Sequence, residues 1–239
     1  MLEEDDASRI LVITAHPDDV DFGAAGTMAT WAKAGREITY CIVTDGDAGG
    51  FDPAVDRSKI AGIRRAEQTA AAAEVGVSEL TFLGYPDGRL EMSIDLRRDI
   101  SRVIRQVRPQ RVLCQSPERS WERIFASHPD HLVAGEAAMC AVYPDARNPF
   151  AHPELALEGW EAWSVPEVWV MTQSGANVWV DITDVIDRKV AALQCHASQI
   201  ADPSGLGDRM RGWATMQARA GGLPEGRLAE SFMRVDTAG

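Results

Sequence analysis

Two short polar segments of the chain contain the residue types that bind and activate a metal ion. The first segment holds one imidazole and three carboxylates: His16, Asp18, Asp19 and Asp21. Carboxylates this close repel one another, and a divalent cation removes that cost while using the same groups as ligands. The turn lets His16 and Asp19 point the same way, while Asp18 can stay off the metal and face the open side.

The second segment, residues 127–131, contains His128 and His131 with Asp130 between them. His131 could complete a His/Asp/His ligand set with the first segment. Three protein ligands leave a coordination position for water, which is typical of catalytic rather than structural zinc. A single strand-end Asp is usually a helix cap and a single His is usually packed or on the surface. Two compatible clusters at one edge of a sheet favour a site over that simpler explanation.

Both segments follow predicted β-strands. Apolar, β-branched runs at 9–15 and 37–44 flank a helical stretch at 23–34, which predicts a βαβ unit. The alternation continues with strands at 80–83 and 111–115 and helices at 57–75, 95–107 and 131–142. The order predicts a Rossmann-like, three-layer α/β fold with a doubly wound, mainly parallel sheet. Ligands bind at the carboxyl ends of strands in such sheets, where both polar segments lie.

The second half of the chain is less regular. Its patterns predict strands at 166–172 and 177–182 and a helix at 183–200. Residues 202–239 show no strong strand signal and are expected to form a short helix plus coil. We expect a single domain over residues 1–239, with about 202–239 as its C-terminal extension.

The composition restricts the partners and the compartment. With 36 acidic and 24 basic residues the net charge is −12, which argues against binding nucleic acid or a membrane surface. The N-terminal segment lacks the basic and apolar stretches of a signal peptide, and no run approaches the ~20 apolar residues of a membrane helix. Four cysteines without CxxC spacing predict free, mostly buried thiols and a reducing cytoplasm.

The two polar segments resemble the signature of a known family. Ala15-His16-Pro17-Asp18-Asp19, paired with His128-Pro129-Asp130-His131, resembles the LmbE-like, or PIG-L, family of zinc-dependent N-acetylglucosaminyl de-N-acetylases. That family includes the mycothiol-pathway deacetylase and conjugate amidase. The resemblance covers most of the chain, with weaker matches at Asp45-Gly46, at Arg64-x-x-Glu67, and at residues 84–88 and 192–199.

The resemblance implies a zinc-dependent amidase that removes an acyl group from an amino-sugar conjugate, a thiol conjugate or a related small polar metabolite. The implied Zn²⁺ ligands are His16, Asp19 and His131. Asp18 would act as general base on the metal-bound water. His128, when protonated, would match the charge of the tetrahedral oxyanion, or it would protonate the leaving amine. Asp130 would orient or tune a neighbouring imidazole.

The substrate-binding residues are implied less strongly. By the resemblance Arg64 and Asp87 would contact the polar substrate, although they also suit a solvated helix face and a Pro-Asp-Gly turn. Trp121 and Arg123, in the loop before the second segment, are the best candidates for specificity. Some sugar deacetylases of the family carry a Tyr shortly before the second segment. The corresponding residue here is Ala126, so no phenol role can be carried over.

Three other functions compete with the amidase. The same metal scaffold could hydrate the double bond of an unsaturated carboxylic acid, with nearby arginines binding the carboxylate. Nucleotide binding is disfavoured because residues 23–26 do not complete GxGxxG and the neighbouring carboxylates would face a pyrophosphate. A non-catalytic binding module predicts loss of the base or a ligand, yet all are present. Apolar residues near 160–169 also suggest a homo-oligomer as a hypothesis.

Overall fold

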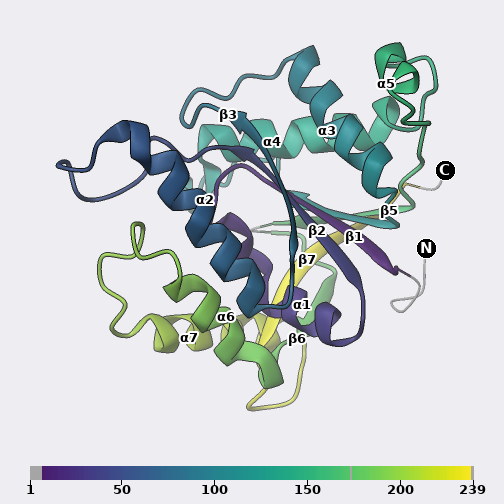
Figure 1. The fold of residues 1–239 in the computed structure, drawn as a ribbon. Helices are drawn as coiled ribbons and strands as arrows, with labels where there is room; N and C mark the ends of the chain where they lie inside the picture. Colours follow the sequence, from purple (N-terminus) through teal and green to yellow (C-terminus); the bar gives the residue numbers. More distant parts are fainter. Residues whose placement is uncertain (1–6, 173, 238–239) are drawn as a thin grey trace.

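The structure is a mixed β-sheet with helices on both faces (Figure 1). The computed structural model describes residues 7–172 and 174–237. The strands pair in the order β3-β2-β1-β4-β5-β7-β6. Their bounds are β1 (Arg9–Thr14), β2 (Glu37–Thr44), β3 (Glu79–Tyr85), β4 (Arg111–Gln115), β5 (Glu167–Met171), β6 (Val178–Asp181) and β7 (Ala229–Asp236).

Two helical layers cover the sheet, as the three-layer prediction requires. One face carries α1 (Asp19–Lys33), α2 (Arg57–Glu74), α6 (Ile186–Gln194) and α7 (Leu206–Ala220). The other carries α3 (Ile94–Val107) and α4 (Pro129–Cys140). The connections contain α5 (Pro153–Leu157) and the turns η1 (Ile124–Ser127), η2 (Ala141–Asp145) and η3 (Thr183–Val185). The predicted α/β fold is confirmed.

The strand order reverses at the centre of the sheet, between β1 and β4. β1 pairs in parallel with β2 on one side and with β4 on the other. After β1 the chain enters α1 on one face, and after β4 it enters α4 on the opposite face. Diverging connections of this kind open a crevice at the carboxyl ends of the two strands, where doubly wound folds bind ligands. Both polar segments lie at this crevice.

Residues 229–236 form β7, so the prediction of coil for this region was wrong. β7 runs antiparallel between β5 and β6. Charged residues interrupt the apolar pattern by which a strand is recognised in the sequence. In the structure they are paired, Glu230 with Lys189 at 2.6 Å and Arg234 with Glu167 at 2.7 Å. Because Phe232 of β7 joins the core around α1, we propose that residues 202–237 belong to the same domain.

Smaller differences concern helix ends. α1 begins at residue 19 rather than 23, and α6 ends at residue 194 rather than near 200. The four cysteines are free thiols, with Cys41 and Cys114 buried. Within residues 7–172 and 174–237, no helix has the length and apolar character needed to cross a bilayer.

Candidate metal and catalytic site

Three side chains converge at the crevice from two elements. His16 and Asp19 lie in the turn from β1 into α1, and His131 lies in the first turn of α4. His16 Nδ1 is 3.1 Å from His131 Nε2. The Asp19 carboxylate faces both rings, with Oδ2 3.3 Å from His16 Nδ1 and Oδ1 3.0 Å from His131 Nε2. Two imidazole nitrogens and a carboxylate at one point are the donors of a three-ligand metal site.

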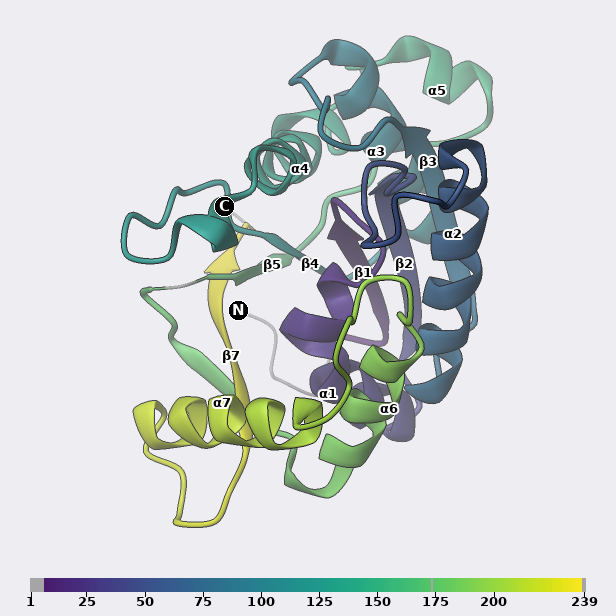
Figure 2. The same cartoon turned by 90° about the vertical axis from the view of Figure 1, so that its left-hand side faces the viewer.

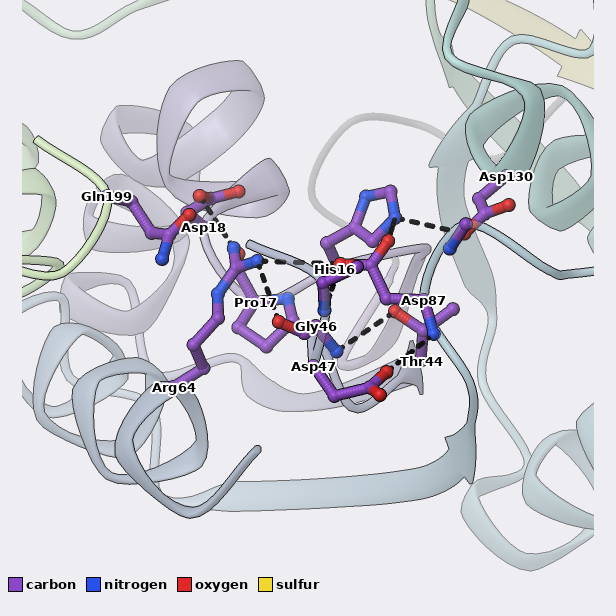
Figure 3. Close-up of polar contacts among 12 residues, drawn as sticks. His16, Pro17, Asp18, Thr44, Gly46, Asp47, Arg64, Asp87, Asp130 and Gln199 are labelled. Carbon is purple, nitrogen blue, oxygen red and sulfur yellow. Dashed lines mark hydrogen bonds and ion pairs between the residues drawn. The ribbon is translucent and has the colours of Figure 1, made fainter. Parts of the chain in front are cut away.

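The other nitrogen of His16 decides which ring atom can act as a ligand. His16 Nε2 lies 3.0 Å from Asp87 Oδ1 and 3.2 Å from Asp130 Oδ2 (Figure 3). Because carboxylates accept hydrogen bonds, Nε2 carries a proton, and Nδ1 is the ring atom that faces His131 and could bind a metal. The imidazole that Asp130 contacts is therefore His16. Asp130 is itself held by backbone N–H groups of Gly88 and Leu90.

The charges around these rings favour a cation. Burial alone would lower the pKa of His16, but hydrogen bonds with Asp130, Asp19 and Asp87 outweigh it and raise that pKa to about 12. Burial also disfavours the charged form of Asp19, but His131 and His16 hold the pKa of Asp19 well below its usual range. The cluster therefore retains protons on its nitrogens, and a divalent cation can replace them. The donor types and the electrostatics both fit a metal ion.

A second group of donors lies on the far side of His16. It combines His16 with the carboxylates of Asp87 and Asp130. Those two residues are 7% and 1% exposed and accept backbone hydrogen bonds, which leaves little room for a water on a metal held between them. The His131 side chain is 20% exposed. The side of His16 that faces Asp19 and His131 is therefore the better place for a catalytic metal.

Asp18 is held in an uncommon conformation at the start of α1. Its φ is 94°, in the left-handed region that is costly for residues other than glycine. Its N–H donates to Gln68 Oε1 at 2.7 Å, and its Oδ2 accepts from Arg64 Nη2 at 2.8 Å. Burial raises the pKa of Asp18 to about 7, helped by Asp19 and opposed by Arg64. A carboxylate of that basicity, fixed beside His16 and Asp19, is suited to accept a proton.

His128 lies against the rings of His16 and His131. Its ring centroid is 4.8 Å from that of His16 and 5.3 Å from that of His131. His128 Nδ1 accepts the backbone N–H of Asp130 at 3.2 Å. Burial is the largest cause that lowers the pKa of His128, and the charges of His16 and His131 lower it further. The lowered pKa favours the neutral ring, and because Nδ1 accepts a hydrogen bond, Nε2 is the nitrogen that carries its proton.

The four residues predicted to bind substrate fall into two pairs. Arg64 and Asp87 are nearly buried within the site, where Arg64 also donates to the carbonyl oxygens of Pro17 and Gly46. Figure 3 shows Arg64 reaching toward the turn that contains His16, Pro17 and Asp18. Trp121 is 83% exposed in the loop before η1, and Arg123 lines a separate cavity beside α7. The structure thus gathers only the first pair around the cluster, within the described residues.

A buried hydrogen-bonded chain behind Asp18 escaped the sequence analysis. Gln68 Nε2 donates to Asp21 Oδ2 at 2.8 Å, and the same oxygen lies 2.8 Å from His196 Nε2. Asp21 therefore faces these partners, contrary to the expectation that it joins the cation-binding carboxylates. His196 reaches Asp18 through Asp21 and Gln68. The spacing of Gln68, one helical turn after Arg64, is a signal that could have revealed it.

Comparisons with known proteins agree with this geometry. The family model for the GlcNAc-PI de-N-acetylases (PIG-L) matches residues 11–142. The chain is 32% identical over 198 residues to diacetylchitobiose deacetylase from Thermococcus kodakarensis, which covers 82% of this chain and 72% of that protein. It is 29% identical over 200 residues to a probable N-acetyl-alpha-D-glucosaminyl L-malate deacetylase 2 from Bacillus anthracis. That match covers 81% of this chain and 82% of that protein.

Solved structures extend the match to the whole fold. N,N'-diacetylchitobiose deacetylase from Pyrococcus horikoshii, complexed with its inhibitor MPG, has a TM-score of 0.88 at 29% identity, covering 97% of this chain and 85% of that chain. The 4-carboxy-2-hydroxymuconate hydratase from Pseudomonas putida has a TM-score of 0.78 at 23% identity, and the match covers 95% of this chain and 96% of that chain. At this identity the likeness shows only that the fold is shared. The predicted N-deacetylase is thus confirmed, and the hydratase alternative is weaker. The chain belongs to the GlcNAc-PI de-N-acetylase, or PIG-L, family.

Proposed function

We propose that the protein is a zinc-dependent deacetylase that hydrolyses the N-acetyl amide of a small N-acetylglucosamine conjugate. The observation that carries this proposal is the open donor set of His16, Asp19 and His131, with Asp18 held beside it. The two relatives described above are named as deacetylases of N-acetylated sugar compounds, which supports the substrate class.

The residues of the chain divide the reaction between them. Bound Zn²⁺ would lower the pKa of a coordinated water toward ~7 and polarise the amide carbonyl. Asp18, positioned by Arg64, accepts the proton of the attacking water. His128 donates its Nε2–H to the carbonyl oxygen as negative charge develops there. The proton held by Asp18 then passes to the nitrogen as the amine leaves.

Arg64 and Asp87 serve two purposes in this proposal. Arg64 holds the base through its bond to Asp18, and Asp87 holds the His16 ring from behind. Where their remaining donors and acceptors border the crevice, they contact the polar part of the substrate. Substitutions at either residue should therefore alter kcat as well as KM.

Two reactions followed together test the proposed function. The full chain is incubated with N-acetylated amino-sugar conjugates and, separately, with unsaturated dicarboxylic acids, while amine release and alkene loss are measured. Amine release that a chelator abolishes and added Zn²⁺ restores is the expected result. Alkene loss without amine release would replace the deacetylase with a hydratase. Metal analysis of the purified protein identifies the bound ion.

A further inference from the structure

An aromatic cavity of about 340 Å³ begins one helical turn beyond the metal ligand Asp19. Phe22 and Gly23 of α1 form one wall, and Phe22 N–H donates to the carbonyl oxygen of Asp18. Met171, at the end of β5, forms another wall and is the register partner of Gln115 on β4. The cavity and the metal cluster therefore lie at the same edge of the sheet. Figure 2 shows the arrangement of α1, α7 and β7, which all contribute lining residues.

The lining of the cavity suits a ring with polar substituents. Trp179, Trp213 and Phe22 supply aromatic surface, and Arg123 lies near the Trp213 ring at 5.9 Å. Gln217 Oε1 accepts the Ser231 hydroxyl at 2.7 Å, and among the described residues the Gln217 amide nitrogen makes no hydrogen bond. Aromatic surface with a few hydrogen-bonding groups is a common composition for small-molecule sites.

The two buried charged residues of the cavity, Lys189 and Glu230, are already partnered. Lys189 Nζ donates to Glu230 Oε1 at 2.6 Å and to the Phe22 carbonyl oxygen at 2.7 Å. Glu230 also accepts from the Thr27 hydroxyl at 2.6 Å. The two opposite charges thus compensate each other at short range, and neither is left to pair with a ligand.

We propose that this cavity binds the second ring of the substrate, a pyranose or a ring of similar size linked to the N-acetylated sugar at the metal cluster. The inference rests on the proposed function and adds the part of the substrate that the metal site does not contact. A volume near the lower end of the ~300–1,000 Å³ range of ligand pockets fits one ring rather than a long chain.

Two variants test the cavity, and a third is the matched control. Ala214→Trp fills the cavity from α7, and Trp213→Leu removes an aromatic wall. Met216→Trp places the same large side chain on the same helix at a residue that is 60% exposed and outside the cavity. Diacetylchitobiose and N-acetylglucosamine serve as two-ring and one-ring substrates for kcat/KM. Asp18→Asn is then combined with each variant. Binding of diacetylchitobiose, N-acetylglucosamine and N-acetylglucosaminyl malate to these proteins is measured by calorimetric titration.

The decisive result is the ratio of kcat/KM for the disaccharide to kcat/KM for the monosaccharide. Ala214→Trp should lower kcat/KM for the disaccharide at least about tenfold relative to the monosaccharide, and Trp213→Leu about 2–10-fold. Met216→Trp should leave the ratio unchanged. Equal losses for both substrates, or an unchanged ratio in both cavity variants, would overturn the proposal, as would tighter binding of the malate conjugate than of the disaccharide.

The calorimetric titrations distinguish a failure of this inference from a failure of the proposed function. If the unsubstituted protein releases no amine, the proposed function fails. A two-ring preference in the Asp18→Asn titrations that Ala214→Trp abolishes would still support the cavity. If amine is released from both sugars without any preference, the deacetylase stands and the cavity assignment fails.

Discussion

The parallel part of the sheet and its antiparallel end contribute different properties to the protein. The groups suited to bind a metal and move protons follow β1, β3 and β4, where buried carboxylates and imidazoles lie within about 3 Å of each other. The end formed by β6, β7 and α7 is aromatic, and its buried Lys189–Glu230 pair is internally compensated. The two parts therefore differ in chemistry, because one gathers ionisable side chains and the other offers mainly aromatic surface.

The largest effect is expected from removing a ligand on the parallel side. His131→Ala should lose both bound metal and deacetylation, because the remaining two ligands cannot hold the ion and no cation is left to polarise the amide. Metal content is measured by elemental analysis and activity by amine release. Full zinc occupancy in the variant would remove His131 from the ligand set and favour the alternative donors around His16.

Asp18→Asn should separate the base from the ligands. We expect the variant to retain zinc while kcat falls by ~10²–10⁴, the usual contribution of a general base. The amide keeps the hydrogen-bonding shape of the side chain, so its neighbour Arg64 remains partnered. Circular dichroism and metal analysis provide the controls. Zinc loss equal to that of His131→Ala would contradict the division into base and ligand.

On the antiparallel side, Phe232→Ala should reduce stability without affecting the metal. The ring is fully buried and lies 5.5 Å from that of Trp169, so its removal leaves a cavity and should cost about 3–5 kcal/mol of unfolding free energy. Denaturant titration measures the loss, and zinc affinity is measured under conditions where the variant is folded. A large fall in the zinc affinity of the folded variant would contradict the view that the antiparallel end does not affect metal binding.

The titration of Asp18 should depend on the metal. Burial raises the pKa of Asp18 to about 7 in the metal-free protein, and a cation nearby would stabilise the carboxylate and lower that pKa. The base form is lost as pH falls, so the acid limb of kcat/KM should lie below pH 7 and drop about tenfold per pH unit. Arg64→Gln removes a charge that lowers the pKa of Asp18 and should move the limb upward. Carboxyl NMR of the metal-free protein checks the starting value, and a midpoint near the ordinary ~3.9 would contradict it.

The same contrast explains what the sequence could predict. The parallel strands are apolar runs, and His16, Asp19 and His131 follow them in a combination that few structural roles require. β7 could not be recognised, because the partners that neutralise its charged residues lie 41 and 67 positions away in the sequence. The orientation of Asp21 was missed for a similar reason, since its partner Gln68 comes from another helix. Local patterns report periodicity and residue type, whereas these features depend on pairing between distant segments.

The smallest effect is expected at Trp121, which lies in the loop between β4 and η1. Its ring is 83% exposed, so Trp121→Ala should change the unfolding free energy by no more than ~0.5 kcal/mol. If the ring stacks on a substrate group that projects from the crevice, KM should rise roughly 2–5-fold while kcat is retained, in line with one exposed aromatic contact. Phe150→Ala, at a residue 89% exposed, is a control for the loss of a surface aromatic side chain. An unchanged KM would remove Trp121 from the substrate-binding residues and leave specificity to the aromatic cavity. A fall in kcat with constant KM would instead mean that the loop positions the second polar segment.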